Sequence, residues 1–466
     1  MLSIVSGETV SARRNIPAVD RVLEMLDAHS LPRPVVVRVV REHLASLRKS
    51  GEIPEVDGIV RRIIEKLDRL DRSRIQPVLN GTGVLVHTNL GRSPLGETAA
   101  QSLSEAAVSY TNLEFDLNHG KRGSRAEYLE HNLAILCGAE AATVVNNCAA
   151  ALVLILRHFC GGEKNEVVIS RGELIQIGGG FRIPDILESS GARLREVGTT
   201  NKTSIEDYEL AIGDRTGLVL QVHRSNFFME GFVASPPTKD LARLARKKKV
   251  PLIEDLGSGA MVDTDRLAPI EHEPTPAESL KQGVALVCFS GDKLFGGPQS
   301  GIIAGKKRLV RAVKQEPFFR ALRCDKLVLS ALQATVDAYL NGASDSDRAA
   351  TIPLLEMLAA PCGPFRTRAD TIVESLRGLP VEAGVKDSFA RIGGGSLPRS
   401  RIPSIAVWLR PETETAAHLS SRLRLSHPPV IGYVEKGVLM LDLRTVLPGQ
   451  DGSLIRALHA ALEIRT

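Results

Sequence analysis

CFSGDKLFGGPQSG, residues 288–301, places a single lysine, Lys293, among small residues directly after an apolar run. The run VALVCF (284–289) has the length and composition of a buried strand, so Lys293 is expected at the carboxyl end of that strand. Its glycines permit unusual backbone angles and a close approach of another molecule. Desolvating a charged lysine in such a place costs free energy unless the charge is paired or its pKa falls. The stretch is therefore typical either of a reactive amine beside a ligand or of an ordinary surface loop.

Outward from this stretch, short apolar segments alternate with helical segments and glycine-rich turns. The segments are ATVVNN (142–147), NEVVIS (165–170), GLVLQVH (217–223), VPLIEDLG (250–257), VALVCFSGD (284–292) and SGIIAG (300–305). This alternation predicts an α/β fold built from βαβ units, with a mostly parallel sheet covered on both faces. Ligands of such sheets bind at the carboxyl ends of the strands, so the residues that follow each strand are the candidate site residues.

Two regions with a different sequence pattern flank this core. Residues 1–75 have helical periodicity, as in VDGIVRRIIEKLDRL (56–70), and carry 14 Lys and Arg against 11 Asp and Glu. They predict a small helical domain whose basic faces either contact nucleic acid or are simply solvated. Residues 336–466 mix helices with strands such as SIAVWL (404–409) and a hairpin in VIGYVEKGVLMLDL (430–443), which predicts a smaller α+β domain. We therefore expect three domains, 1–75, 76–335 and 336–466.

The composition is that of an ordinary soluble α/β protein, with a net charge of +5 and 43% hydrophobic residues. Six cysteines form no CxxC pair, which predicts reduced core cysteines in a cytoplasmic protein. No stretch resembles a signal peptide, and the most apolar helical segment, AAALVLIL (149–156), is too short to span a bilayer. Neither a metal-ligand spacing nor a nucleotide-binding fingerprint is present, so we expect no metal and no membrane contact.

Three strand ends together predict a site for pyridoxal phosphate. Lys293 is the residue type that forms a Schiff base with this cofactor, and Asp255 is the acid that its ring nitrogen requires. Asn147 and Cys148 open an alanine-rich helix whose N–H groups suit the phosphate. The further cofactor-binding candidates are Ser290 in the lysine loop and His223 and Ser225 in VHRSNF (222–227). For these last two, a capped polar turn is the alternative.

The combination of four stretches resembles one known family. NGTGVLVHTNLGRSPL (80–95), LIQIGGGFRIP (174–184), EDLGSGA (254–260) and SGDKLFGGPQSG (290–301) are similar to sequences of the bacterial L-seryl-tRNA(Sec) selenium transferases, the selenocysteine synthases. The resemblance runs over essentially the whole chain. It implies a fold-type I pyridoxal-phosphate-dependent transferase with an N-terminal helical domain that binds tRNA and a C-terminal α+β domain. It also implies a cytoplasmic homo-oligomer, a ring of dimers.

The resemblance also implies a reaction. Seryl-tRNA(Sec) bound to the cofactor loses its Cα proton and its β-hydroxyl, and selenium from selenophosphate adds to the resulting dehydroalanyl group to give selenocysteinyl-tRNA(Sec). Lys293 is implied as the general base, and Asp292 assists proton transfer, tunes Lys293 or merely caps its loop. Arg92, Arg320 and Arg323 are implied to bind selenophosphate, and the family's assemblies imply that these arginines reach the active site of a neighbouring subunit. The spacing of Arg320 and Arg323 predicts that both lie on one helix face.

Two alternative functions remain open at this stage. One is a pyridoxal-phosphate-dependent lyase or β-eliminase that acts on a small free amino acid or amino sugar acid. Such an enzyme has no need for a separate basic helical domain, which favours the tRNA reaction. The other is a tRNA-binding protein with a vestigial core, and the presence of both Lys293 and Asp255 argues against it. The stretch GGGSLP (393–398) has no mechanistic interpretation and is expected to be a loop at a domain interface.

Overall fold

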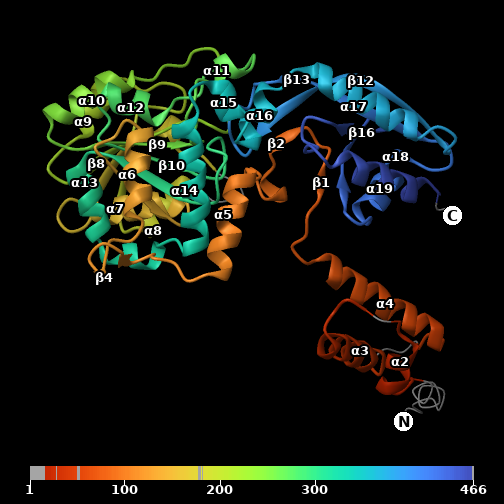
Figure 1. The fold of residues 1–466 in the computed structure, drawn as a ribbon. Coiled ribbons are helices and arrows are strands. Elements are labelled where there is room, and N and C mark those ends of the chain that lie inside the picture. The colour runs from red at the N-terminus through yellow and green to blue at the C-terminus, as the bar shows by residue number, and fades with distance from the viewer. Residues whose placement is uncertain (1–15, 28, 50–52, 177–179, 181, 464–466) are drawn as a thin grey trace, which may run out of the picture. The chain divides into compact units, whose positions relative to one another are not determined.

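The computed structural model describes residues 16–27, 29–49, 53–176, 180 and 182–463. By its internal contacts the chain divides into two compact units, Met1–Val78 and Leu79–Thr466 (Figure 1). The first boundary lies close to the predicted end of the helical domain. The predicted boundary between residues 335 and 336 falls inside helix α14 (Lys326–Asn341), and the division into three domains stays a prediction.

The first unit is helical, as its periodicity predicts. It contains α2 (Val19–Met25), α3 (Arg33–Leu47) and α4 (Val56–Arg72). In α4 the side chains of Ile59, Ile63 and Leu67 recur every four residues and are buried in a common core with the other helices. The charged residues of α4 lie off this stripe, so the helix is amphipathic. Packing of its apolar face against the other helices stabilises the unit.

The second unit is built around a seven-stranded sheet with the strand order β5-β11-β10-β9-β8-β6-β7. The strands are β5 (Ala141–Val145), β6 (Glu166–Ser170), β7 (Arg193–Val197), β8 (Thr216–Val222), β9 (Leu252–Gly257), β10 (Leu286–Ser290) and β11 (Gly301–Gly305). Only β11 runs against its neighbours β5 and β10. The mostly parallel sheet is therefore confirmed. The polar edge strand β7 was not predicted.

Both faces of this sheet are covered, which explains the continuous apolar runs. Val287 and Phe289 of β10 belong to one apolar core, whereas Leu286 and Cys288 belong to another on the opposite face. Helices α6 (Glu127–Leu136), α10 (Thr238–Lys247) and α14 contribute to the first core. Helices α7 (Cys148–Phe159), α8 (Ile183–Ser189) and α13 (Lys307–Gln315) contribute to the second (Figure 1).

Shorter elements complete this region. They are η1 (Thr88–Leu90), α5 (Glu97–Val108), β3 (Phe115–Asp116), β4 (Lys121–Arg122), η2 (Arg171–Glu173), α9 (Ile205–Ala211), α11 (Thr264–Leu267), α12 (Pro276–Gln282), η4 (Pro317–Leu322), α15 (Asp345–Ala349) and α16 (Pro353–Ala359). Among the described residues no helix combines the length and the apolar character needed to cross a membrane.

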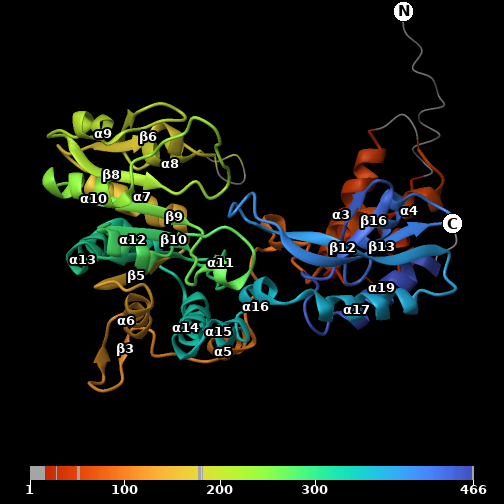
Figure 2. The ribbon, with the colours of Figure 1, turned by 90° about the horizontal axis from the view of Figure 1, so that it is seen from above.

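A smaller five-stranded sheet has the order β15-β16-β13-β12-β2. Its strands are β2 (Val84–Val86), β12 (Val381–Gly393), β13 (Ile402–Pro411), β15 (Tyr433–Glu435) and β16 (Val438–Asp442). The helices of this region are α17 (Cys362–Ser375), α18 (Ala416–Arg424) and α19 (Asp451–Glu463), and β1 (Leu79–Asn80) pairs separately with β14 (Val430–Ile431). The predicted hairpin is confirmed, because Glu435 pairs with Val438. The longer hairpin β12–β13 extends toward the large sheet and carries GGGSLP at its tip (Figure 2).

Candidate active site

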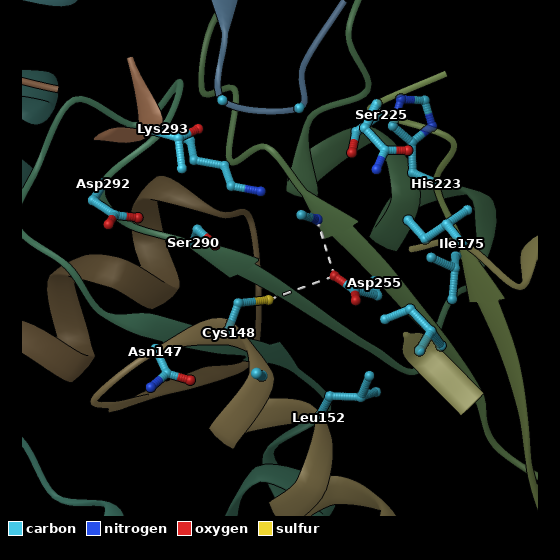
Figure 3. Close-up of a pocket in the computed structure, with 18 of the residues that line it drawn as sticks. Asn147, Cys148, Leu152, Ile175, His223, Ser225, Asp255, Ser290, Asp292 and Lys293 are labelled. Atoms are coloured by element: carbon cyan, nitrogen blue, oxygen red, sulfur yellow. Dashed lines mark hydrogen bonds between the residues drawn. The ribbon is translucent and has the colours of Figure 1, made fainter. Parts of the chain in front are cut away.

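A cavity of about 650 Å³ opens where the strands of the large sheet end (Figure 3). It brings together nine of the residues predicted from the sequence. They are Arg92, Asn147, Cys148, His223, Ser225, Asp255, Ser290, Asp292 and Lys293. We refer to this cavity as the Lys293 pocket. Its size suits a small cofactor with part of a substrate.

Lys293 lies in the turn between β10 and β11, and backbone contacts fix that turn. Gly291 N donates to Ser300 O at 2.9 Å, and Leu294 N donates to Ser258 O at 2.9 Å. Ser93 Oγ donates to Lys293 O at 2.7 Å, so the lysine backbone is held from a distant part of the chain. The amine points into the pocket (Figure 3).

Gly257 marks the spot that three of these side chains face. A Cβ at this glycine would lie 4.0 Å from Lys293 Nζ, 3.9 Å from Asp255 Oδ1 and 3.6 Å from Ser225 Oγ. Its backbone has φ +65°, which favours glycine. The missing side chain leaves room for a ligand between an amine, a carboxylate and a hydroxyl.

Asp255 lies two residues before the end of β9, and its buried carboxyl group has few hydrogen-bond donors. Its Oδ1 accepts from Gly257 N at 3.0 Å and from Cys148 Sγ at 3.5 Å. Burial raises the pKa of Asp255, against the opposing effects of Lys293 and these two donors. Lys293 and the two donors do not fully offset burial, so a further cationic partner would stabilise the carboxylate, and a protonated ring nitrogen is such a group.

The turn after β5 fits a phosphate. Asn147 is the N-cap of α7, and its side chain accepts from Ala150 N at 2.8 Å. The N–H groups of Cys148 and Ala149 have no acceptor among the described residues, and both residues line the pocket. Gly301 is required beside them, because a Cβ there would lie 2.1 Å from Asn147 O. Free N–H groups at a helix N-terminus bind phosphate. The residues present thus fit pyridoxal phosphate at both of its ends.

His223 follows β8, and its backbone N–H donates to the backbone carbonyl oxygen of Asp255 at 2.9 Å. Its Nε2 lies 3.4 Å from Oε1 of Glu273, a carboxylate that is 1% exposed. Burial opposes the charged imidazole, but Glu273, with help from Glu254 and Asp255, raises the pKa of His223. Glu273 was not predicted from the sequence, because it lies in the loop before α12 and follows no strand.

Asp292 and Arg92 form an ion pair at the rim of the pocket. Arg92 Nη1 donates to both carboxylate oxygens of Asp292 at 2.8 Å, and Asp292 is only 5% exposed. Arg92 has φ +67°, an unusual value for a residue with a side chain. Arg92 thus reaches the pocket with its charge already partly balanced by Asp292.

Arg320 and Arg323 lie outside this pocket. They line a second cavity of about 530 Å³, here called the arginine pocket, together with Arg125 and Lys314. The expectation that they share a helix face is wrong. The 3-10 helix η4 ends at Leu322, and Arg323 is its extended cap residue. Leu322 O accepts from Asn146 N at 2.9 Å, which holds the segment beside the end of β5.

Glu114 partly balances the charge of the arginine pocket. Its Oε1 accepts from Arg125 Nη1 at 2.8 Å and from Arg323 Nη1 at 3.1 Å, while Arg122 Nη2 donates to Oε2 at 2.8 Å. The hydrogen bond from Arg125 is the main cause that lowers the pKa of Glu114. Arg320 has no ion-pair partner among the described residues.

Several lining residues were not predicted. The most unexpected are Gly394 and Gly395 at the tip of β12–β13, which line the Lys293 pocket. Both have positive φ, and a Cβ at Gly395 would lie 3.2 Å from Asn226 Cβ. The run of glycines in GGGSLP was the available signal. Residues 177–179 and 181, within the stretch 174–184, lie outside the described residues.

Comparison with known proteins bears on this geometry. A model of the L-seryl-tRNA selenium transferase family matches residues 78–447, and a model of the selenocysteine synthase N-terminal region matches residues 13–48. The chain belongs to the L-seryl-tRNA selenium transferase family. The curated L-seryl-tRNA(Sec) selenium transferase of Moorella thermoacetica is 44% identical over 98% of both chains. That of Aquifex aeolicus is 41% identical over 97% of this chain and all of its own.

Among solved structures, that of a D-glucosaminate-6-phosphate ammonia-lyase is similar with a TM-score of 0.57. It is 20% identical and covers 84% of this chain and 96% of its own. At this identity the likeness concerns the fold alone. The predicted fold-type I architecture, the fold of pyridoxal-phosphate-dependent enzymes, is confirmed, and the chain is a member of a family of transferases.

Proposed function

We propose that this chain converts seryl-tRNA(Sec) to selenocysteinyl-tRNA(Sec) with pyridoxal phosphate as its cofactor and selenophosphate as the selenium donor. One observation carries the proposal. In a member of this transferase family, the Lys293 amine and the Asp255 carboxylate face one spot beside Gly257, next to a helix N-terminus that suits a phosphate.

Each end of the cofactor has its own partners in this proposal. Lys293 Nζ would hold the aldehyde carbon, and Asp255 would hold the ring nitrogen in its protonated form. The N–H groups of Cys148 and Ala149, at the turn that Asn147 caps, would hold the phosphate. Ser225 or His223 would face the phenolic oxygen, with Ser290 in the same wall. When bound, the cofactor supplies an electron sink that makes the Cα proton of the seryl group acidic.

Side chains of the protein would then carry out the proton transfers. Lys293 Nζ is placed to take the Cα proton of the seryl group as a general base. Lys293 can then return that proton to the departing β-hydroxyl, which leaves as water. Asp292, oriented by the 2.8 Å hydrogen bond from Arg92, lies at the rim where it can accept a hydrogen bond and assist this transfer. The glycine tip at Gly394 and Gly395 restricts access of water on its side of the pocket.

The arginine pocket is proposed as the site of the selenium donor. Arg320 and Arg323 offer planar donors that suit phosphate-like oxygens. Within one chain these arginines line a different cavity from Arg92 and Lys293. This separation supports a homo-oligomer, a ring of dimers by resemblance, in which neighbouring subunits complete each other's sites.

The helical unit is proposed to bind the tRNA. It is compact by itself, and its basic residues lie off the buried stripe of α4. A phosphate backbone is the natural partner of such faces. Because the substrate is a charged tRNA, we place the enzyme in the cytoplasm.

The visible absorption spectrum of the purified protein tests the proposal most directly. A cofactor band that changes on titration with seryl-tRNA(Sec) and not with free serine is the expected result. A band that changes with a free amino acid and ignores the tRNA would favour a small-molecule lyase. A colourless protein that cannot be loaded with pyridoxal phosphate would overturn the cofactor assignment.

A further inference from the structure

Two thiols and a carboxylate converge on the floor of the Lys293 pocket. Cys148 Sγ lies 3.5 Å from Asp255 Oδ1 (Figure 3). The ligand atoms of Cys148, Cys288 and Asp255 all lie within 4.8 Å of one another. All six cysteines of the chain are free, so no disulfide occupies these thiols. The mechanism proposed above gives Cys288 no role.

The sheet itself creates this cluster. Cys288 of β10 and Asp255 of β9 are register partners on neighbouring parallel strands, so their side chains point to the same face. Helix α7 packs on that face, and its first residue, Cys148, therefore lies above them. Cys288 is fully buried behind Cys148, whereas Cys148 lines the pocket and is reached from it.

We propose that Cys148, Cys288 and Asp255 form a binding site for a thiophilic divalent cation such as Zn²⁺ or Cd²⁺, which is available only when the cofactor is absent. Two thiolates and one carboxylate oxygen make three ligands, and the fourth position opens toward the pocket, where water completes a tetrahedron. The ion and the cofactor exclude each other because both require Asp255. The exclusion rests on the proposed use of pyridoxal phosphate.

The observed spacing suits this geometry. With Zn–S of about 2.3 Å and Zn–O of about 2.0 Å at the tetrahedral angle, the sulfur and oxygen atoms stand about 3.5 Å apart. Cys148 Sγ and Asp255 Oδ1 already have this separation. Only modest adjustment of the Cys288 side chain is needed to bring its sulfur to the same ion.

The charge balance of the site points the same way. Asp255 is a buried carboxylate whose Oδ2 accepts no hydrogen bond from the described residues. A buried carboxylate requires a cation or a strong donor. In the loaded enzyme the ring nitrogen meets this need. In the apoenzyme a metal ion held by the adjacent thiolates meets it, and the thiol protons are released to solvent as the ion binds.

The test uses the full chain, first loaded and then stripped of cofactor by a carbonyl reagent. Equilibrium dialysis against Zn²⁺ and the thiolate-to-metal absorption of Cd²⁺ report binding. We expect one ion per chain in the apoenzyme, its release on adding pyridoxal phosphate, and no uptake by the loaded enzyme. Uptake that is unaffected by pyridoxal phosphate, or no uptake by the apoenzyme, would overturn the proposal.

Matched variants locate the ion. Cys288→Ser should load cofactor with normal absorbance, which shows that the variant is folded. Its affinity for zinc should fall by more than about 100-fold, since loss of a partner that only supports a ligand already costs roughly 10–100-fold. Cys148→Ser should lose it as well. Cys362→Ser, which alters a cysteine elsewhere, should bind zinc normally. Uptake that survives both substitutions and disappears in His272→Ala would assign the ion to the exposed group Asp263, His272 and Glu278 and refute the site.

The failure of this proposal and the failure of the proposed function are distinguishable. A protein that never gains visible cofactor absorbance would overturn the cofactor assignment, whatever its zinc content. A protein that loads cofactor normally, and whose apoenzyme takes up no zinc, would overturn the metal site alone.

Discussion

The Lys293 pocket and the arginine pocket have opposite charge balances. Around the first, Asp255, Glu254 and Glu173 are buried carboxyl groups, and burial raises the pKa of each of them. Beside the second, the carboxylate of Glu114 accepts from three arginines, and its pKa is lowered. Glu130 and Glu316 line that pocket too, and they pair with Lys314 and Arg157. Beside the first pocket, buried carboxyl groups have few cationic partners, whereas the lining of the second has more cationic than acidic side chains.

This difference indicates what each pocket is suited to hold. A site rich in desolvated carboxyl groups stabilises a cation such as a protonated ring nitrogen. A site rich in guanidinium groups stabilises an oxyanion, and the proposed selenium donor is one. The two halves of the reaction, removal of water and addition of selenium, would then depend on different residues. Substitutions in each pocket test whether the two half-reactions separate in this way.

Lys293→Ala should abolish the visible cofactor band and reduce turnover by on the order of 10³-fold or more, because it removes both the attachment point and the general base. Absorbance spectra and single-turnover assays with seryl-tRNA(Sec) measure these effects. Lys293→Arg is the matched control, since it keeps the charge and loses the reactive amine, and it should fail equally. A variant that keeps the band would contradict the assignment of Lys293.

The double substitution Arg320→Ala with Arg323→Ala should raise the KM for the selenium donor by roughly 10–100-fold, the size expected from losing charge-assisted hydrogen bonds. Loss of the β-hydroxyl from the seryl group should proceed nearly unchanged. Quenched assays that follow each half-reaction separate the two effects. Arg122→Ala is the control, because Arg122 also binds Glu114 but does not line the pocket. Equal damage to both half-reactions would remove the contrast between the pockets.

The same contrast shows what the sequence could reveal. Strand ends of a parallel sheet meet at one edge, so Asp255, Lys293 and the Asn147 turn could be placed together from strand pattern alone. The arginines depend on η4, an irregular segment whose path is set by tertiary contacts such as that of Leu322 with Asn146. Glu273 was missed for a similar reason. The backbone N–H of Glu273 donates to Thr264 Oγ1 at 2.9 Å, a hydrogen bond that no local sequence pattern indicates.

Glu273→Gln should lower turnover by roughly 10-fold, about the cost of one charge-assisted hydrogen bond. Glu273 raises the pKa of His223, so the variant should lose protonated His223 at a lower pH than the wild type. The acidic shift should be visible in the pH profile of both kcat/KM and the cofactor band. A purely structural role would lower stability and leave both profiles in place. Glu271→Gln is the control, because Glu271 pairs with Arg399 at the surface.

Two glutamates allow the comparison to be measured without any substrate. Burial raises the pKa of Glu173 from 4.5 to about 8, so the folded state binds the extra proton between these values. The wild type should therefore lose stability, relative to Glu173→Gln, as pH rises from about 4.5 to about 8, by on the order of a few kcal/mol. Glutamine keeps an oxygen for Val222 N, which now donates to Glu173 Oε2 at 3.0 Å.

Glu114→Gln should show the opposite sign, because the arginines hold the pKa of Glu114 below its usual value. Relative to Glu114→Gln, the wild type is stabilised by this carboxylate at pH values above the pKa of the unfolded state. It loses that stabilisation as the pH falls through the lowered pKa of the folded state. Urea unfolding of the wild type and both variants between pH 4 and 9 measures the two slopes. Slopes of the same sign would mean that the pockets do not differ in charge balance, and the assignment of a cation to one and an oxyanion to the other would lose its basis.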